Sequence, residues 1–279
     1  MTASIAKQPI LAARTARNAL DLSVKSWVAI ALIGQWAFTF YLLVIYVISS
    51  SFGLDPVDFS PAPSIRSDDA TVRSVFFVHV IPAIYLSFFG LLQLVPKIRN
   101  RYRNFHRWNG RIFLALGMSG AITGLFLQWS KGDETNTAAS LGITFNGLLI
   151  VGAVVMAWLT AIRKRFDLHR RWAVHAFILI NGVWTFRLYL MGWYMVNQGP
   201  NGNTRNIDGP MDIFLSFACY LLPMVLAEIY FWLDKETSNK RLWGATAFMS
   251  IGAIITLIGV AAAIMMMWTP RILKVFAAV

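Results

Sequence analysis

The chain has 279 residues, of which 57% are hydrophobic and 14% charged, and it carries a formal net charge of +12. This composition leaves few side chains for chemistry, and the single cysteine, Cys219, excludes an intrachain disulfide. The basic residues lie mainly beside apolar runs. The positive charge therefore indicates contact with anionic lipid head groups and excludes nucleic acid as the expected partner.

Apolar runs long enough to cross a bilayer recur seven times along the chain. A membrane helix needs about 20 apolar residues because the hydrocarbon core is about 30 Å thick. The sequence therefore predicts an all-α, polytopic membrane bundle of seven transmembrane helices. The runs are 27–48, 75–95, 112–129, 143–162, 172–196, 212–233 and 244–268.

The connections between these runs are alternately rich and poor in Lys and Arg. The N-terminal arm and the loops 97–111, 163–171 and 234–241 together carry 18 of these residues, whereas the remaining loops and the C-terminal tail carry 6. Arginine-rich loops stay in the cytoplasm, so we expect the N-terminus to be cytoplasmic and the C-terminus to lie outside. The bacterial cytoplasmic (inner) membrane is the simpler location. The mitochondrial inner membrane is the alternative, because the Arg- and Ala-rich arm resembles a presequence.

We expect a single domain, because no internal linker is long or polar enough to separate two. Residues 1–26 form the cytoplasmic arm, which the sequence predicts as a helix on the inner membrane surface. Residues 27–268 form the transmembrane domain, with 75–196 as its functional core, and 269–279 form an outer tail. In the third run, Gly120 and Gly124 favour close helix packing or leave room for a flat cofactor.

The four histidines fall near the ends of predicted spans. His106 just precedes the third span, His169 just precedes the fifth, and His175 lies about one turn inside the fifth. Three histidines therefore share the cytoplasmic boundary on two parallel helices. His79 lies near the outer end of the second span and has no histidine partner there, which disfavours a second haem.

The segments around His106 and His169 are alike, since each places a His-Arg pair and a Trp where a helix enters the bilayer. The simpler interpretation is that these residues are interfacial anchors. The chemical interpretation starts from the positive charge nearby, which disfavours the protonated ring and predicts neutral imidazoles. The surrounding arginines are Arg99, Arg101, Arg103, Arg107 and Arg111 near His106, and Arg163, Arg165, Arg170 and Arg171 near His169.

A neutral imidazole is the form that binds a metal, and histidine commonly holds haem iron. One histidine from each of two helices can hold one haem b, so His106 is expected to pair with either His169 or His175. A quinone is the alternative cofactor. The arginines nearest these rings are expected to neutralise haem propionates or another anion through bidentate hydrogen bonds. They are Arg107, Arg111, Arg170 and Arg171.

Two charged residues lie inside predicted spans: Arg187 near the middle of the fifth, and Glu228 toward the inner end of the sixth. An intramembrane ion is costly and usually faces a protein interior where it has partners. The two depths differ too much for a direct pair. We expect Asn146, Gln128 or the backbone to partner Arg187.

For Glu228 the expected partner is His175 or Arg171, and its role is either proton relay or a structural hydrogen bond.

Four short segments carry a resemblance to a known family. They are His79, the Phe89-Gly90-Leu91-Leu92-Gln93 stretch, His106-Arg107-Trp108-Asn109-Gly110-Arg111 and His169-Arg170-Arg171-Trp172. The chain thereby resembles a bacterial family of multi-pass membrane proteins described as a domain of unknown function. The resemblance covers the second to fifth spans and implies a helical membrane fold. His175 stands where the family has an arginine, so it is not a carried-over position.

A weaker resemblance is to the ascorbate-reducible b-type transmembrane cytochromes, whose central helices carry haem-ligating histidines. Those cytochromes use one histidine pair near each face, whereas this chain has three histidines at one face and one at the other. The leading hypothesis is a haem- or quinone-linked redox protein with its site near the cytoplasmic face. The alternative is a non-enzymatic lipid- or anion-binding transporter, or an accessory subunit of a larger membrane complex. The expected partners are the anionic bilayer and a membrane complex or homo-oligomer.

Overall fold

The computed structural model describes the backbone of residues 2–130 and 138–279, and the side chains of residues 14–130, 138–234 and 236–279. Lys131, one of the basic residues counted in the outer loops, lies outside these ranges. Within the described ranges every regular element is helical and no strand is present. The all-α prediction is therefore confirmed.

Six helices are long and apolar enough to cross a membrane, and a bent pair brings the total to seven across the described chain. The long elements are α1 (Thr2–Leu43), α3 (Ala70–Phe89), α5 (Arg103–Trp129), α6 (Ala138–Ile162), α9 (Pro210–Trp232) and α10 (Asn239–Ala262), and the bent pair is α7 (Phe166–Ile180) with α8 (Gly182–Asn197). The short elements are η1 (Val44–Ile48), α2 (Ser49–Ser51), η2 (Pro56–Asp58), η3 (Pro63–Arg66), η4 (Leu91–Leu94), α4 (Pro96–Arg101), η6 (Leu233–Lys235), η7 (Ala263–Trp268) and α11 (Thr269–Ala278).

The predicted fifth span is broken, with α7 and α8 meeting at 55°. The break lies at Asn181, whose Nδ2 donates to the carbonyl of Phe177 (2.8 Å) and whose Oδ1 accepts from Nε2 of Gln35 in α1 (2.8 Å). Glycine at the next position leaves room for the Asn146 side chain, because a Cβ on Gly182 would lie 2.8 Å from its Nδ2. Buried amides from three helices therefore fix a bend that the apolar run 172–196 did not predict.

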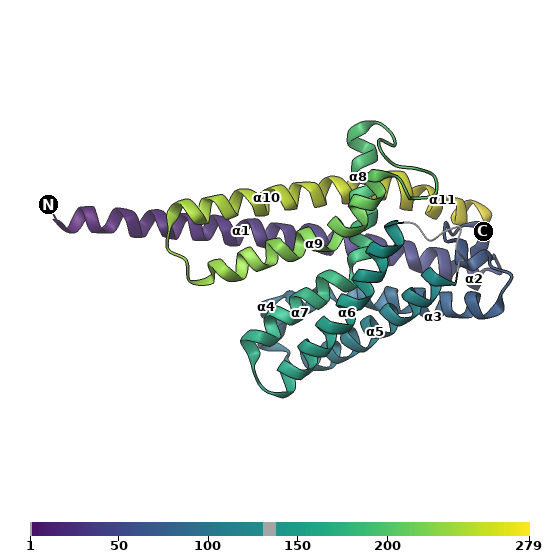
Figure 1. Ribbon diagram of the computed structural model, residues 1–279, viewed down its shortest axis with the longest axis horizontal. Coiled ribbons are helices and arrows are strands. Elements are labelled where there is room, and N and C mark those ends of the chain that lie inside the picture. Colours follow the sequence, from purple (N-terminus) through teal and green to yellow (C-terminus); the bar gives the residue numbers. More distant parts are fainter. Residues whose placement is uncertain (1, 131–137) are drawn as a thin grey trace.

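The helices form two groups (Figure 1). In one group α1 and α10 lie side by side and run parallel along most of their length, and α3, α5, α6 and α7 form the other. The groups meet toward the end that holds the C-terminus and diverge toward the end that holds the N-terminus. We call the end with the loops 97–111, 163–171 and 234–241 the arginine-rich end, and the end with the loops 49–73 and 197–210 the opposite end.

The helix α8 crosses α10 at close range. A Cβ on Gly259 of α10 would lie 2.7 Å from the carbonyl oxygen of Leu188, and Gly192 of α8 faces the Cα of Gly259. Small residues at such a crossing let two backbones approach closely, which is how membrane helices gain packing energy. This crossing holds the bent span against the α1–α10 pair.

The N-terminal arm differs from its prediction. It is a helix, but it continues α1 in a straight line (Figure 1). Ala16 and Leu20 are buried with Leu242 of α10, and Arg17 donates to the carbonyl of Leu233 (2.6 Å). These contacts make residues 14–26 an extension of the first span packed on its neighbours, and not a separate helix on a membrane surface.

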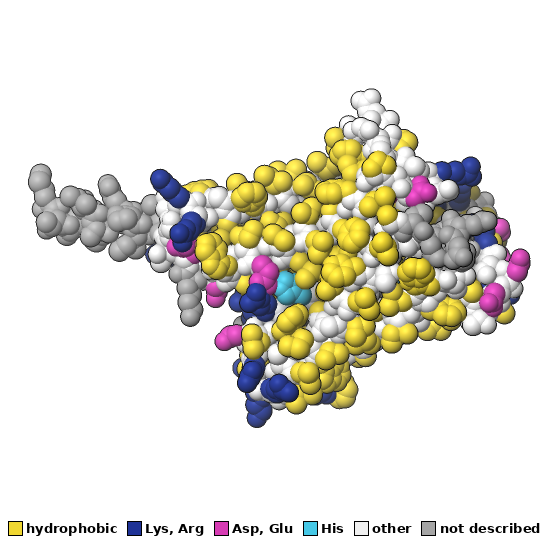
Figure 2. All heavy atoms as spheres, in the orientation of Figure 1, with side chains coloured by type: hydrophobic (Ala, Val, Ile, Leu, Met, Phe, Trp, Pro, Cys, Tyr) yellow, Lys and Arg dark blue, Asp and Glu magenta, His cyan; other side chains and the backbone are white. Residues whose placement is uncertain are grey.

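The outer surface is largely apolar. Large hydrophobic side chains such as Ile122, Phe214 and Phe248 are exposed, and Figure 2 shows hydrophobic atoms over most of the visible helices. Basic side chains gather at the arginine-rich end in the same view. An exposed apolar surface of this extent is typical of contact with lipid.

Candidate functional site

Glu228 of α9 binds two side chains of α7 at the arginine-rich end. Its carboxylate accepts a bond from Nε of Arg171 (2.8 Å), a second bond from Nη2 of Arg171, and a bond from Nε2 of His175. A bidentate arginine–carboxylate pair is among the stronger hydrogen-bonded contacts. Figure 2 shows a histidine beside an adjoining acidic and basic side chain where α7 and α9 meet. The partners predicted for Glu228 are therefore both present.

The ring of His175 is enclosed. Its exposed fraction is 5%, and the rings of Trp172 and Phe231 lie 6.2 and 6.4 Å from it. Its Nδ1 is buried and has no hydrogen-bond partner. Arg170 lies over the same Phe231 ring at 5.4 Å. The arrangement can pass a proton between His175 and Glu228, and it commits one nitrogen of His175 to the carboxylate.

His106 ends a chain of hydrogen bonds between α3, η4 and α5. The hydroxyl of Tyr85 donates to Oδ1 of Asn109 (2.8 Å). In the carboxamide orientation that satisfies its neighbours, Gln93 accepts from Nδ2 of Asn109 and donates to Nδ1 of His106 (2.9 Å). A Cβ on Gly110 would lie 3.2 Å from the Gln93 side chain, so a glycine there lets Gln93 approach α5. In this orientation the neutral His106 ring carries its hydrogen on Nε2.

His169 is held by the neighbouring helix α6. Its Nδ1 lies 2.9 Å from the carbonyl oxygen of Ala157. A carbonyl can only accept, so Nδ1 carries the hydrogen and the neutral ring keeps its lone pair on Nε2. The ring is partly exposed.

The three histidines at the arginine-rich end are not gathered into one metal cluster. The helices that carry His106 and His169, α5 and α7, are joined by the stacked rings of Phe113 and Phe177, whose centroids lie 5.9 Å apart. Among the described residues, no group of three or more His, Cys, Asp or Glu side chains could hold a metal ion. His175 is thus bound to Glu228, whereas His106 and His169 are the histidines of this end that contact no described carboxylate.

The predicted anion-binding arginines divide in the same way. Arg171 is bound to Glu228, whereas Arg107, Arg111 and Arg170 are exposed. Arg111 lies over the ring of Trp108 at 4.9 Å. The exposed arginines can still meet an anion at the membrane boundary, but Arg171 would first have to release its carboxylate.

The two remaining polar residues of the predicted core lie elsewhere. Nδ1 of His79 lies 2.9 Å from the hydroxyl of Thr123, and a Cβ on Gly124 would lie 3.1 Å from the His79 ring. This contact is the helix packing predicted for Gly124, whereas the packing predicted for Gly120 was wrong, because a Cβ there would meet no described atom within 4 Å. Arg187 donates to the backbone carbonyl of Val183 (3.2 Å), which is one of its predicted partners.

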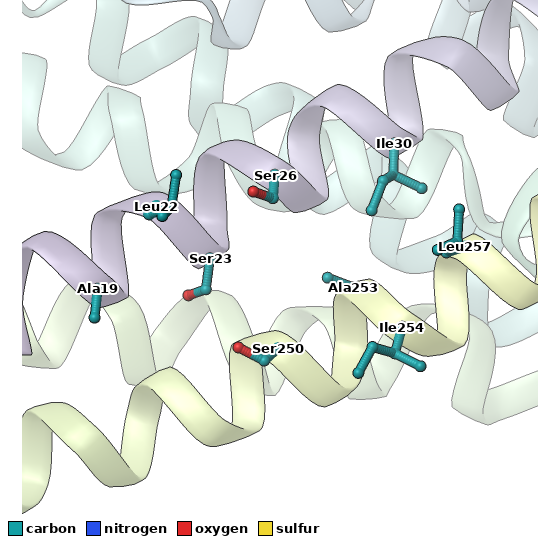
Figure 3. A pocket seen from close by; sticks show the side chains of 9 residues that line it. All are labelled: Ala19, Leu22, Ser23, Ser26, Ile30, Ser250, Ala253, Ile254 and Leu257. Atoms are coloured by element: carbon teal, nitrogen blue, oxygen red, sulfur yellow. The ribbon is translucent and has the colours of Figure 1, made fainter.

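Two surface grooves run between helices. A groove of about 380 Å³ between α1 and α10 has Ser23 and Ser250 facing each other and otherwise only Ser26 and apolar side chains in its walls (Figure 3). It offers no ionisable group. A groove of about 290 Å³ between α1 and α3 is apolar, but Tyr85 lies in its wall. The hydroxyl of Tyr85 connects this second groove to His106 through the chain of bonds described above.

Sequence reasoning missed Tyr85, Asn109 and the Gln35–Asn181 contact. Asn109 is 2% exposed although it stands between basic residues at a helix start, and Gln35 is 1% exposed inside the first span. A buried amide within an apolar helix is the signal that could have indicated them, because buried polar groups need partners.

A family model described as a predicted membrane protein (DUF2306) matches residues 76–231, a range that contains the four histidines, Arg187 and Glu228. No curated protein and no solved structure matches the chain.

Proposed function

The chain belongs to the DUF2306 family of predicted membrane proteins, and we propose that it is a membrane redox protein that binds haem b near its arginine-rich end through His106 and His169. One observation carries this proposal. The two rings lie on the neighbouring helices α5 and α7, and each has one nitrogen held by the protein and the other without a hydrogen-bond partner in the described chain. When bound, haem supplies one-electron chemistry.

His169 already has the tautomer of a metal ligand. Metal-binding histidines usually donate their second ring N–H to a carbonyl or carboxylate, which fixes the ring and raises its basicity. The carbonyl of Ala157 plays that part for Nδ1 of His169 and leaves the Nε2 lone pair for iron.

His106 needs one local change to bind iron. With Gln93 donating to Nδ1, the hydrogen lies on Nε2, which then acts as a donor. A half-turn of the Gln93 carboxamide would place its oxygen against Nδ1–H and free Nε2, at the expense of the bonds from Asn109 and from the Gly110 backbone. Replacement of Gln93 by Glu supplies an acceptor without a donor, so Gln93→Glu should favour the ligand tautomer.

Groups near the two rings can position the haem and exchange protons. Arg107, Arg111 and Arg170 lie exposed near the rings and can bind propionates. His175 and Glu228 form a hydrogen-bonded acid–base pair next to them. The apolar groove beside Tyr85 fits the ring of a quinone as the electron partner, because Tyr85 begins a hydrogen-bond chain that ends at His106.

The second candidate function is binding of anionic lipid by the exposed arginines. It is favoured by the excess of unpaired positive charge at the arginine-rich end. Among the described residues there, Arg171 and Arg241 form ion pairs and the other arginines do not. This function requires no haem and no histidine.

Absorbance of protein purified from cells supplied with a haem precursor separates the two functions. The redox proposal predicts a Soret band that shifts on reduction, lost in His106→Ala and retained in His79→Ala, the matched histidine control near the opposite end. A colourless wild-type protein whose lipid binding depends on Arg107 or Arg111 would overturn the redox proposal and support the second function.

A further inference from the structure

Arg187 lies on α8 among aromatic side chains and away from the histidine site. Its guanidinium is 5.6 Å from the centre of the Phe38 ring of α1. The hydrogen bond that it makes to a described residue goes to the carbonyl of Val183, one turn earlier in its own helix. A guanidinium has five N–H donors, so most of its hydrogen-bonding capacity is unused.

A second arginine, Arg271 of α11, follows Trp268 by three residues, and the Trp268 ring packs on Phe38. Arg271 donates to the carbonyl of Met267 (2.7 Å), also one turn earlier in its own helix. The charges of Arg187 and Arg271 both act on Tyr41 and Tyr46, and they repel each other. No carboxylate among the described side chains forms an ion pair with either arginine. The region therefore holds two positive charges that lack a counter-ion in the described protein.

Trp268 adds an unsatisfied donor to this region. Its exposed fraction is 1%, its Nε1 is buried without a partner, and its ring lies 5.5 Å from Phe38 and 6.3 Å from Tyr41. Phe38 is therefore shared between Trp268 and Arg187. The rings are buried, whereas Arg187 keeps part of its surface accessible. Donors and positive charge thus collect around Phe38.

We propose that Arg187 and Arg271 bind an oxyanion, a carboxylate or a phosphate, beside Phe38, Tyr41 and Trp268. The planar fork of arginine matches both groups and forms two parallel hydrogen bonds to either of them. A negative charge between the two arginines would also remove their mutual repulsion. Because this site shares no residue with His106 and His169, it can fail or stand independently of the haem proposal.

The oxyanion can be a free ion or the head group of an amphiphile, and calorimetric titration of protein in phosphatidylcholine nanodiscs distinguishes these sources. The probes are inorganic phosphate, laurate, and dodecanol, which has the chain length of laurate and no charge. Saturable binding of phosphate indicates a site for the free ion. Binding of laurate but not phosphate indicates the head group of an amphiphile. Either result, binding of phosphate or binding of laurate alone, supports the oxyanion site under two conditions. Dodecanol must not bind, and Arg187→Gln must weaken binding at least tenfold.

Two further variants keep the test decisive if Arg187→Gln does not fold. Arg271→Gln removes the second charge, and Trp268→Phe removes the buried N–H while keeping an aromatic ring. Each should weaken the same binding several-fold. The matched control is Arg205→Gln, an exposed arginine in the loop 197–210, which should leave binding unchanged. Absence of binding to the wild type, or equal binding by the wild type and all three site variants, would overturn the proposal.

Discussion

The two charged residues inside the predicted spans, Glu228 and Arg187, have opposite surroundings. Glu228 binds Arg171 and His175, so the arginine-rich end contains a compact network in which every charge has a partner. Arg187 contacts rings and one carbonyl of its own helix, and none of the described carboxylates pairs with it. Removing a member of a satisfied network strands its partners, whereas removing an unpaired charge strands none. We therefore expect Glu228 to stabilise the fold and Arg187 to bind a ligand, although both are charged residues inside predicted spans.

The largest expected effect is a difference in thiol labelling between the two ends of the bundle. In a Cys219→Ser background, Arg103→Cys and Asp58→Cys place one thiol at each end. The charge asymmetry predicts that an impermeant thiol reagent labels position 58 but not position 103 in intact cells. Both positions should react in permeabilised cells. Labelling at 103 without labelling at 58 would reverse the topology and exchange the sides assigned to the two regions.

The next effect is loss of the paired acid. Glu228→Leu should lower the free energy of unfolding by about 1–2 kcal/mol, because it leaves the buried His175 ring without its acceptor, whereas the half-exposed Arg171 can turn to solvent. Glu228→Gln keeps one acceptor oxygen and should lower the free energy of unfolding by less. Thermal unfolding in detergent measures both changes. A Glu228→Leu protein as stable as the wild type would mean that the contact with α7 contributes little to folding.

A smaller effect is expected at the unpaired charge. Arg187→Leu should leave the melting temperature at or slightly above that of the wild type, because a charge inside a membrane span without a counter-ion is costly and its removal leaves no described partner unsatisfied. Arg205→Leu serves as an exposed control. A loss as large as that of Glu228→Leu would indicate that Arg187 has a structural partner and would remove the contrast between the two regions.

The smallest effect is a pH dependence at the arginine-rich end. Backbone N–H groups of Ser238 and Thr237, together with Arg241, lower the pKa of Glu236 from its ordinary value of 4.5 to about 2. A carboxyl whose pKa is lowered by folding stabilises the protein above its unfolded pKa and loses that contribution as pH falls toward its folded pKa. Glu236→Gln should therefore reduce the fall in melting temperature between about pH 4.5 and 2. An unchanged pH profile would show that the carboxylate does not stabilise this turn, and Asp234→Asn is the control.

The sequence predicted the helical bundle and the partners of Glu228 because both follow from local rules. Apolar run length indicates a membrane helix, and an acid at the depth of His175 and Arg171 has few other partners. The break at Asn181 was not predictable, because the residues on both sides are apolar and the bend depends on amides from α1 and α6. The prediction that residues 14–26 lie on the membrane surface was wrong for the same reason. The course of this segment depends on its packing against α10.

The candidate site was predicted less completely. The His-Arg segments drew attention to His106 and His169, but the roles of their ring nitrogens depend on Gln93 and the carbonyl of Ala157, which come from other elements. His175 looked equivalent to His169 by position. The structure separates them, because only His175 reaches Glu228. Contacts between distant segments thus decide which histidine is available to a metal.

The most direct test of the haem proposal is a comparison of reduced-minus-oxidised absorbance spectra for His169→Ala and His175→Ala, with haem content measured on the same samples. We expect His169→Ala to lose the low-spin haem signal, because the free Nε2 of His169 is the proposed ligand, and His175→Ala to keep that signal. A spectrum lost in His175→Ala and unchanged in His169→Ala would contradict the assignment of the ligands, and the absence of haem from the wild-type protein would contradict the proposal itself.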